Sequence, residues 1–409
     1  MRLTCPLCKE PFSLNCKRRE CPVMAKVKSM LITTKRLESE NYFGSSPAPF
    51  VGRFNYPNIS VGILSPPEQR EDSWLLDAPT YWAENNYTID RIIGLRSSLI
   101  NSNFKAHVKN RTKLLEISQE VGMASKPVDV EINLEKKPRF HFTAQPNITP
   151  IGPTAKLRKA EITSNPKIAK KVDYVVSDTD LKAEEGLVYL YEKGFDENFL
   201  SKLLSVANLG LKSNRKLVPT RWSITATDDT LGKNIINEIK QYDESDFMAY
   251  FGGFLGNYYF VMFFSDVWSY ELFEIDTSTF SPKKKNWWTD YESYDGRKNY
   301  ASSTIGGYYA ARLPILNRLK NLRRQASVLA LRFVTSDYYA PLGVWVVREA
   351  TRKAMMSKPI IFEDKDSMLR YAKEFVHHRF QINADVIFRE SKLLNNLRAQ
   401  TKLNAFFSR

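Results

Sequence analysis

Four cysteines near the start of the chain constrain its folding more than any other sequence feature. They are Cys5, Cys8, Cys16 and Cys21, and the rest of the chain has none. Two thiols separated by two residues can bind one ion from a tight turn, and a second pair can complete a tetrahedral zinc site. A peptide this short has no core of its own, so the metal would supply its folding energy. We therefore expect a closed, structural zinc module over residues 1–25.

Two other states of these cysteines stay open from spacing alone. Four thiolates also suit an iron–sulfur cluster, and free or disulfide-bonded cysteines are the third option. Because the rest of the 409-residue chain, after Cys21, lacks cysteine, a disulfide-stapled secreted protein is disfavoured. The sequence therefore predicts a reducing, cytoplasmic location.

The charge balance indicates the class of partner. The chain has 60 Lys and Arg against 45 Asp and Glu, which gives a net charge of +15. An excess of this size favours a polyanionic partner, nucleic acid before membrane. The longest apolar run, 247–264, contains Gly252, Gly253 and Gly256. It predicts a β-hairpin in place of a membrane span, so no membrane partner is expected.

Hydrophobic periodicity along the chain mixes helical and strand patterns. We expect a mixed α/β core of the α+β type over 26–395, either undivided or split into two subdomains at a basic seam near 151–172. A flexible C-terminal peptide follows over 396–409. Helices are predicted over 91–121, 196–207, 231–239, 308–334 and 366–380, and strands over 128–134, 217–227 and 247–275.

The last ten residues carry a second short pattern. Gln400, Leu403, Phe406 and Phe407 follow the spacing Q-x-x-h-x-x-F-F. On one helical turn, the three apolar side chains project to one side as a plug for a partner's groove. The pattern resembles the peptide by which replication and repair proteins dock on the sliding clamp PCNA. The alternative is that both phenylalanines fold back and anchor the tail to the core.

A candidate phosphate site or nucleic-acid site comes from the middle of the chain. In the predicted strand 217–227, Arg221 heads a polar row that ends at Asp228 and Asp229, which can hold a phosphate together with a metal or water. The alternative for Asp229 is a cap on the next helix. Arg312 follows two glycines at a helix start. Together with Arg53 and Arg96, these side chains can line a phosphate-binding groove.

Several segments together resemble the archaeal Nre family of DNA-repair proteins. Besides the cysteines and the tail, they are Val-Gly-Arg-Phe-Asn-Tyr-Pro-Asn at 51–58, Arg-Ser-Ser-Leu-Ile at 96–100, Leu-Val-Pro-Thr-Arg-Trp-Ser-Ile-Thr-Ala at 217–226, Gly-Gly-Tyr-Tyr-Ala-Ala-Arg-Leu at 306–313 and Pro-Leu-Gly-Val-Trp-Val-Val-Arg-Glu at 341–349. The resemblance implies a cytosolic archaeal protein that acts in DNA-damage repair and binds the sliding clamp through Gln400, Leu403, Phe406 and Phe407. It implies no catalytic residue.

The sequence therefore favours a DNA-repair factor that PCNA recruits, with a structural zinc and a basic DNA-contacting surface. One alternative is a nucleic-acid or nucleotide-processing enzyme built around the central Arg/Asp site, so whether the core is catalytic is left open. Because histidine is scarce in the core and cysteine is absent from it, Ser–His and Cys–His catalysis are disfavoured. A second alternative is an RNA-binding assembly protein.

Overall fold

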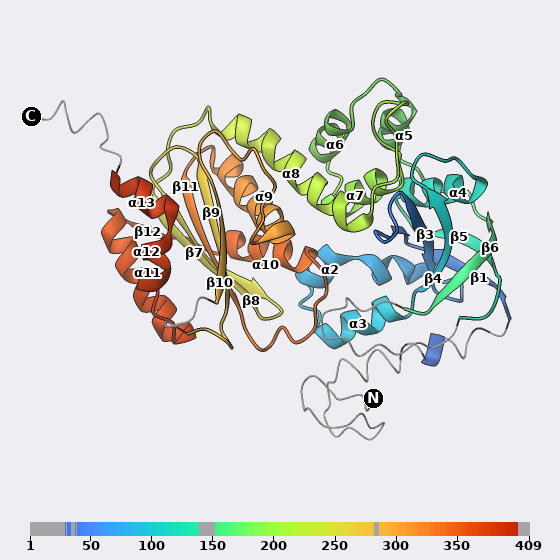
Figure 1. Ribbon diagram of the computed structural model, residues 1–409, viewed down its shortest axis with the longest axis horizontal. Coiled ribbons are helices and arrows are strands. Elements are labelled where there is room, and N and C mark those ends of the chain that lie inside the picture. The colour runs from blue at the N-terminus through green and yellow to red at the C-terminus, as the bar shows by residue number, and fades with distance from the viewer. Residues whose placement is uncertain are drawn as a thin grey trace, which may run out of the picture. The chain divides into compact units, whose positions relative to one another are not determined.

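The computed structural model describes residues 29, 31–33, 37, 39–138, 152–281 and 286–399. Unit 1 is the part up to Leu231 together with Tyr339–Gly343, and unit 2 is Gly232–Tyr338 together with the part from Val344 onward. Each unit contains one six-stranded mixed sheet with helices, which agrees with the predicted mixed α/β class (Figure 1). The four cysteines and the clamp-like peptide lie outside the described residues.

The sheet of unit 1 has the strand order β1-β5-β6-β4-β3-β2. Neighbouring strands are antiparallel except β4 and β6, which are parallel. In β5, buried and half-buried side chains alternate along the strand, the period of a sheet with one covered face. The strands are β1 (Asn41–Ser46), β2 (Ala48–Val51), β3 (Asn58–Ser65), β4 (Ile100–His107), β5 (Val128–Leu134) and β6 (Thr154–Ile162).

Helices of unit 1 pack on this sheet and on one another. Helix α4 contacts β2, β3 and β6, and α7 contacts both β2 and α4. Asp196 caps α7 by accepting a hydrogen bond from Phe199 N over 2.7 Å. The helices are η1 (Glu71–Asp77), α2 (Pro79–Glu84), α3 (Ile89–Ser97), α4 (Lys113–Met123), α5 (Lys170–Ser177), α6 (Ala183–Glu192), α7 (Glu197–Ser205) and α8 (Thr220–Ile239), which ends in unit 2.

The sheet of unit 2 has the order β10-β9-β11-β8-β7-β12, with β9 and β11 parallel. The predicted hairpin is confirmed, because β7 and β8 pair around Leu255 and Gly256, which have φ angles of 51° and 72°. Two residues with positive φ are what a tight hairpin turn needs. The strands are β7 (Phe247–Phe254), β8 (Asn257–Phe264), β9 (Ser269–Asp276), β10 (Trp287–Glu292), β11 (Ser327–Val334) and β12 (Ile360–Phe362).

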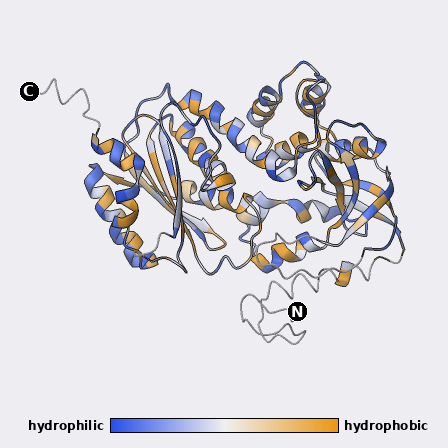
Figure 2. Cartoon of the chain, in the orientation of Figure 1, coloured by the Kyte–Doolittle hydropathy of each residue, from blue (hydrophilic) through white to orange (hydrophobic). Residues whose placement is uncertain are grey.

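Helices cover both faces of this second sheet (Figure 1). Helices α9 (Ile305–Leu322) and α10 (Trp345–Met356) lie on one face, and α11 (Lys365–Phe380), α12 (Asp385–Glu390) and α13 (Lys392–Ala399) on the other. Strands β8 and β11 are accordingly buried along nearly their whole length. Figure 2 shows that α11–α13 turn hydrophilic residues outward.

One buried carboxylate fixes α13 to the sheet. Glu271 on β9 accepts hydrogen bonds from Ser391 Oγ over 2.6 Å, Lys392 N over 3.1 Å and Leu393 N over 3.0 Å. Burial raises the pKa of Glu271, and these hydrogen bonds oppose that effect. A carboxylate at a helix N-terminus satisfies amides that have no partner inside the helix. The segment that ends just before Gln400 is therefore attached to the core.

Residues 217–227 do not form the predicted strand. They belong mostly to α8, which begins at Thr220. The strand interpretation followed the alternation of polar and apolar residues, but the buried side chains Ser223, Thr227 and Leu231 are spaced four apart, as on one helix face. Asp229 lies inside this helix, so its predicted role as a cap is wrong.

Two predicted helices are each interrupted by a strand. Within 91–121, α3 ends at Ser97 and β4 follows, and within 308–334, α9 ends at Leu322 and β11 follows. Strand β11 is a continuous buried run between two neighbours, and periodicity cannot separate such a run from a buried helix. The basic segment 151–172 contains β6 and lies inside unit 1, whereas the two units divide at Leu231.

Among the helices of the described residues, none is long and apolar enough to cross a membrane.

We predict that Glu271→Ala loosens α13. The substitution removes the acceptor of two backbone amides and of the Ser391 and Thr289 hydroxyls, and an unsatisfied buried donor costs about 1–3 kcal/mol. Hydrogen exchange of the amides of 392–399 should accelerate, and the denaturant midpoint should fall. Glu184→Ala, at an exposed position in the first turn of α6, is the matched control and should change neither. Equal exchange in both variants would contradict the anchoring role of Glu271.

Candidate nucleic-acid interface

Three segments of unit 1 meet beside the start of α8. Val108 N donates to Pro57 O over 3.1 Å, and Leu217 N donates to Val108 O over 2.9 Å. Thr220 Oγ1 accepts from Val51 N over 2.9 Å. The loop after β2, the loop after β4 and the segment that leads into α8 are therefore joined by their own backbones.

Exposed aromatic side chains project from two of these segments. The rings of Tyr56 and Trp222 lie 5.4 Å apart between centroids. Tyr56 is 43% exposed, Trp222 45% and Phe54 74%. The guanidinium of Arg53 lies 5.1 Å from the centre of the Phe54 ring. Large apolar side chains gathered at one exposed place indicate a binding surface.

Positive charge surrounds these rings. Five basic side chains on the same three segments are exposed, namely Arg53, Lys109, Arg111, Lys216 and Arg221. Within the part of the chain that the structure describes, none of the five forms an ion pair. We call these five, together with Phe54, Tyr56 and Trp222, the basic–aromatic surface.

A neighbouring arginine shows the effect of this charge. Arg215 donates to three backbone oxygens, those of Gly210, Val176 and Asp178, at 2.7, 2.8 and 2.8 Å. Burial lowers the pKa of the Arg215 guanidinium, and the positive charge of Arg111 lowers it further. An anion bound at this surface would relieve that repulsion.

The predicted site residues of unit 1 lie in different environments: some are exposed, one is ion-paired and others are buried or half-buried. Arg53 and Arg221 both belong to the basic–aromatic surface. Arg96 instead forms an ion pair with Asp77. Asp228 is buried in α8, and Asp229 beside it is half-buried.

Arg312, in unit 2, is committed to an internal ion pair. Its Nη1 lies 2.7 Å from Glu292 Oε2, and both side chains are buried. The guanidinium also lies 5.7 Å from the centre of the Tyr308 ring, and burial raises the pKa of that phenol well above its ordinary value. The Glu292 carboxylate thus already occupies the position expected for a phosphate.

The second of the two glycines ahead of Arg312 lies close to β9. A Cβ on Gly307 would lie 2.6 Å from Glu274 Oε1, so a larger residue there would have to displace that carboxylate. The nearby backbone amides of Ser303 and Thr304 donate to Asp290 over 3.0 and 2.7 Å. An internal carboxylate therefore occupies the donors at this helix start.

Across the described residues, no group of three or more His, Cys, Asp or Glu side chains is placed to hold a metal ion. The predicted zinc ligands Cys5, Cys8, Cys16 and Cys21 lie outside those residues.

Comparison with known proteins identifies the family. The model of the archaeal Nre N-terminal domain matches residues 15–281, and that of the archaeal Nre C-terminal domain matches residues 292–406. The chain belongs to the archaeal Nre family. The resemblance noted from the sequence is confirmed, and no solved structure matches the chain.

Three members of this family are similar over most of their length. "DNA repair protein NreA" of Haloferax volcanii is 38% identical over 82% of this chain and 83% of its own. "DNA repair protein NreB" of Archaeoglobus fulgidus is 37% identical over 87% of this chain and 89% of its own. "DNA repair protein NreA" of the same organism is 38% identical over 92% of this chain and 94% of its own.

Sequence reasoning missed the aromatic half of the surface. The motifs at 51–58 and 217–226 each place an arginine directly before an aromatic residue, Arg53 before Phe54 and Arg221 before Trp222. This repeated pairing of an arginine with an aromatic residue is the sequence feature that could have indicated the surface. Lys109, Arg111 and Lys216 carried no signal of their own, because only the folded chain brings them to the same place.

Proposed function

We propose that this chain is a DNA-repair factor that holds DNA on the basic–aromatic surface of unit 1. The names of its Nre relatives, each called a DNA repair protein, support a role in DNA repair. The single observation that carries the proposal is the contact between Tyr56 and Trp222, flanked in sequence by Phe54 with Arg53 and by Arg221. It joins two sequence-distant segments into one exposed cluster of rings and cations.

The chemistry of this surface suits DNA in two ways. Exposed guanidinium and ammonium groups that form no ion pair within the described residues can bind phosphates and release condensed counterions. Exposed aromatic rings stack on unpaired bases, a contribution of about 1–3 kcal/mol per base. A surface with both elements binds the backbone and also tolerates, or prefers, distorted and single-stranded DNA.

We predict that Arg53→Ala combined with Arg221→Ala weakens DNA binding and its salt dependence. Each lost phosphate contact should reduce the log–log salt slope by about 1. Fluorescence anisotropy with a labelled duplex over a salt series measures both quantities. Arg370→Ala, at an exposed position on α11 of unit 2, is the matched control. If the control and the double variant bind alike, the surface is not the DNA contact.

Tighter binding of RNA than of DNA by the wild type would favour the RNA-binding alternative.

We also propose that Gln400, Leu403, Phe406 and Phe407 bind the sliding clamp PCNA. The support is the match of all four positions to the clamp-binding pattern. Helix α13 ends one residue before Gln400, and Glu271 holds the start of this helix to the core. A short peptide on an anchored helix is presented from a fixed point, which limits the ordering entropy of binding.

We predict that deleting residues 400–409 abolishes clamp binding and leaves DNA affinity within about twofold, because the basic–aromatic surface lies in unit 1. Surface plasmon resonance on immobilised clamp and anisotropy on DNA separate the two effects. Replacing Phe406 and Phe407 by Ala should reproduce the loss, whereas Asn404→Ala, at a position the pattern leaves free, should not. Retained clamp binding without the tail would overturn this assignment.

We further propose that Cys5, Cys8, Cys16 and Cys21 bind one structural zinc. The support is the ligand number and a spacing that places two thiols on one turn. Four thiolates leave no open position, so the ion would stabilise the module and take no part in chemistry.

The zinc proposal predicts one equivalent of zinc per chain in protein purified without chelator. Replacing Cys8 by Ser should lower that content and the protease resistance of the N-terminal segment. Iron with visible absorption, or no metal at all, would contradict the proposal.

A further inference from the structure

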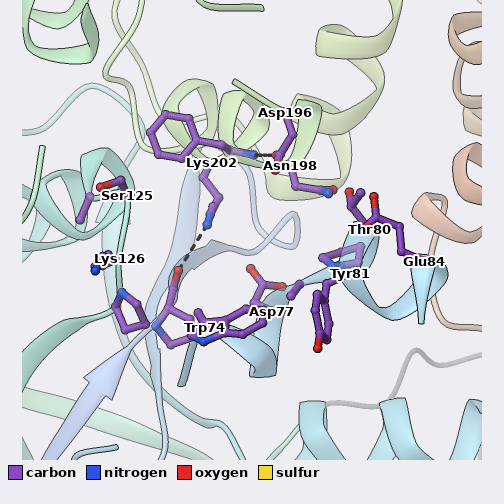
Figure 3. Close-up of a pocket in the computed structure, with 16 residues that line it drawn as sticks. Trp74, Asp77, Thr80, Tyr81, Glu84, Ser125, Lys126, Asp196, Asn198 and Lys202 are labelled. Atoms are coloured by element: carbon purple, nitrogen blue, oxygen red, sulfur yellow. Dashed lines mark hydrogen bonds between the residues drawn. The ribbon is translucent and has the colours of Figure 1, made fainter. Parts of the chain in front are cut away.

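Unit 1 also contains a cavity of about 370 Å³ that the proposed DNA surface does not use. Figure 3 shows it with η1 and α2 on one side and α7 on the other. The residues that define its chemistry are Trp74, Asp77, Tyr81, Glu84, Lys126 and Lys202. A cavity of this size holds a small organic group, such as one nucleotide base.

Two aromatic rings form one corner of the cavity. Trp74 and Tyr81 are nearly perpendicular, at 86°, with centroids 4.9 Å apart. Although both line a cavity, Trp74 is 43% exposed and Tyr81 38%. A flat ligand can lie against one ring face and end against the other ring. The shape therefore suits a planar, aromatic ligand.

The charges of the cavity walls nearly cancel. Asp77 is paired with Arg96 outside the cavity, and Asp196 is used to cap α7. Glu84 then remains as a carboxylate that forms no ion pair in the described part of the chain. Lys126 and Lys202 supply positive charge on the opposite side, where Lys202 Nζ lies 3.3 Å from the carbonyl oxygen of Pro47 (Figure 3).

A neutral cavity with a polar edge suits a base better than a phosphate. A carboxylate accepts hydrogen bonds, so Glu84 suits the amino group of a purine or cytosine. The phosphates of the same strand would stay on the basic–aromatic surface, where positive charge is in excess.

The cavity and the surface lie within reach of one strand of DNA. Pro47 lines the cavity, β2 follows it directly, and Arg53 of the surface comes two residues after β2. At ~3.3 Å per residue, this path is at most ~20 Å long. That length corresponds to about six nucleotides of a B-form strand at ~3.4 Å each.

We propose that the cavity between η1–α2 and α7 takes up one unpaired base of the bound DNA, stacked on Trp74. This inference rests on the proposed DNA-binding function and adds a preference for DNA with an extrahelical base. A base that is already unpaired enters at little cost, whereas a paired base must first be unstacked.

The test compares two labelled duplexes of one sequence, fully paired or carrying a single extrahelical 2-aminopurine, an isomer of adenine. Wild-type full-length protein should bind the bulged duplex about tenfold more tightly, and 2-aminopurine fluorescence should fall as the base stacks on the indole. Trp74→Ala should remove the preference and the quenching while paired-duplex affinity stays unchanged. Tyr81→Ala, which keeps Trp74, should reduce the preference, and Trp74→Phe should retain part of it.

Trp288→Ala is the matched control, since Trp288 is an exposed tryptophan on β10 of unit 2. Its affinities for both duplexes should equal those of the wild type. The double variant of Arg53 and Arg221 should lose affinity for both duplexes alike, which separates the surface from the cavity. Equal binding of both duplexes by the wild type, or a preference that survives in Trp74→Ala, would overturn the base-binding proposal alone. No binding to either duplex would overturn it together with the DNA-binding function.

Discussion

The basic–aromatic surface depends on the backbone hydrogen bonds that join Val108 to Pro57 and Leu217 to Val108. They hold three sequence-distant segments side by side, so the rings and cations of those segments gather although their sequence positions do not. Each such bond contributes only about 0.5–1.5 kcal/mol to stability. They matter because they hold Tyr56 against Trp222, next to cations that form no ion pair within the described residues.

The paired arginines inside unit 2 differ from the arginines of the basic–aromatic surface. In unit 2, Arg297, Arg312 and Arg332 lie within 3.0 Å of the carboxylates of Asp290, Glu292 and Glu274. Buried pairs of this kind fix local structure, because removing one partner leaves an uncompensated charge. Among the described residues, the cations of the basic–aromatic surface have no such carboxylate, so their positive charge stays available to an anion. Solvent screens their mutual repulsion when DNA is absent, so the fold tolerates the cluster.

Much of the fold could be predicted from periodicity, and the failures have identifiable causes. The alternation in β5 and the glycines of the β7–β8 hairpin indicate their structures directly. Strand β4 could not be found, because its residues become a strand only by pairing with β3 and β6. Helix α8 was misread because its Thr and Ile residues favour strands locally, while tertiary packing selects the helix. Of the predicted site, Arg53 and Arg221 lie on the surface, whereas the internal partners of Arg96 and Arg312 are far away in sequence and carry no local signal.

Hydrogen–deuterium exchange of the full chain, with and without a short DNA duplex, locates the DNA contact without substitutions. We predict slower exchange on DNA binding in the three segments that carry the basic–aromatic surface, 52–58, 108–112 and 215–222, with little change in β7–β12. Protection confined to unit 2, or none in these three segments at a DNA concentration that saturates binding, would contradict it.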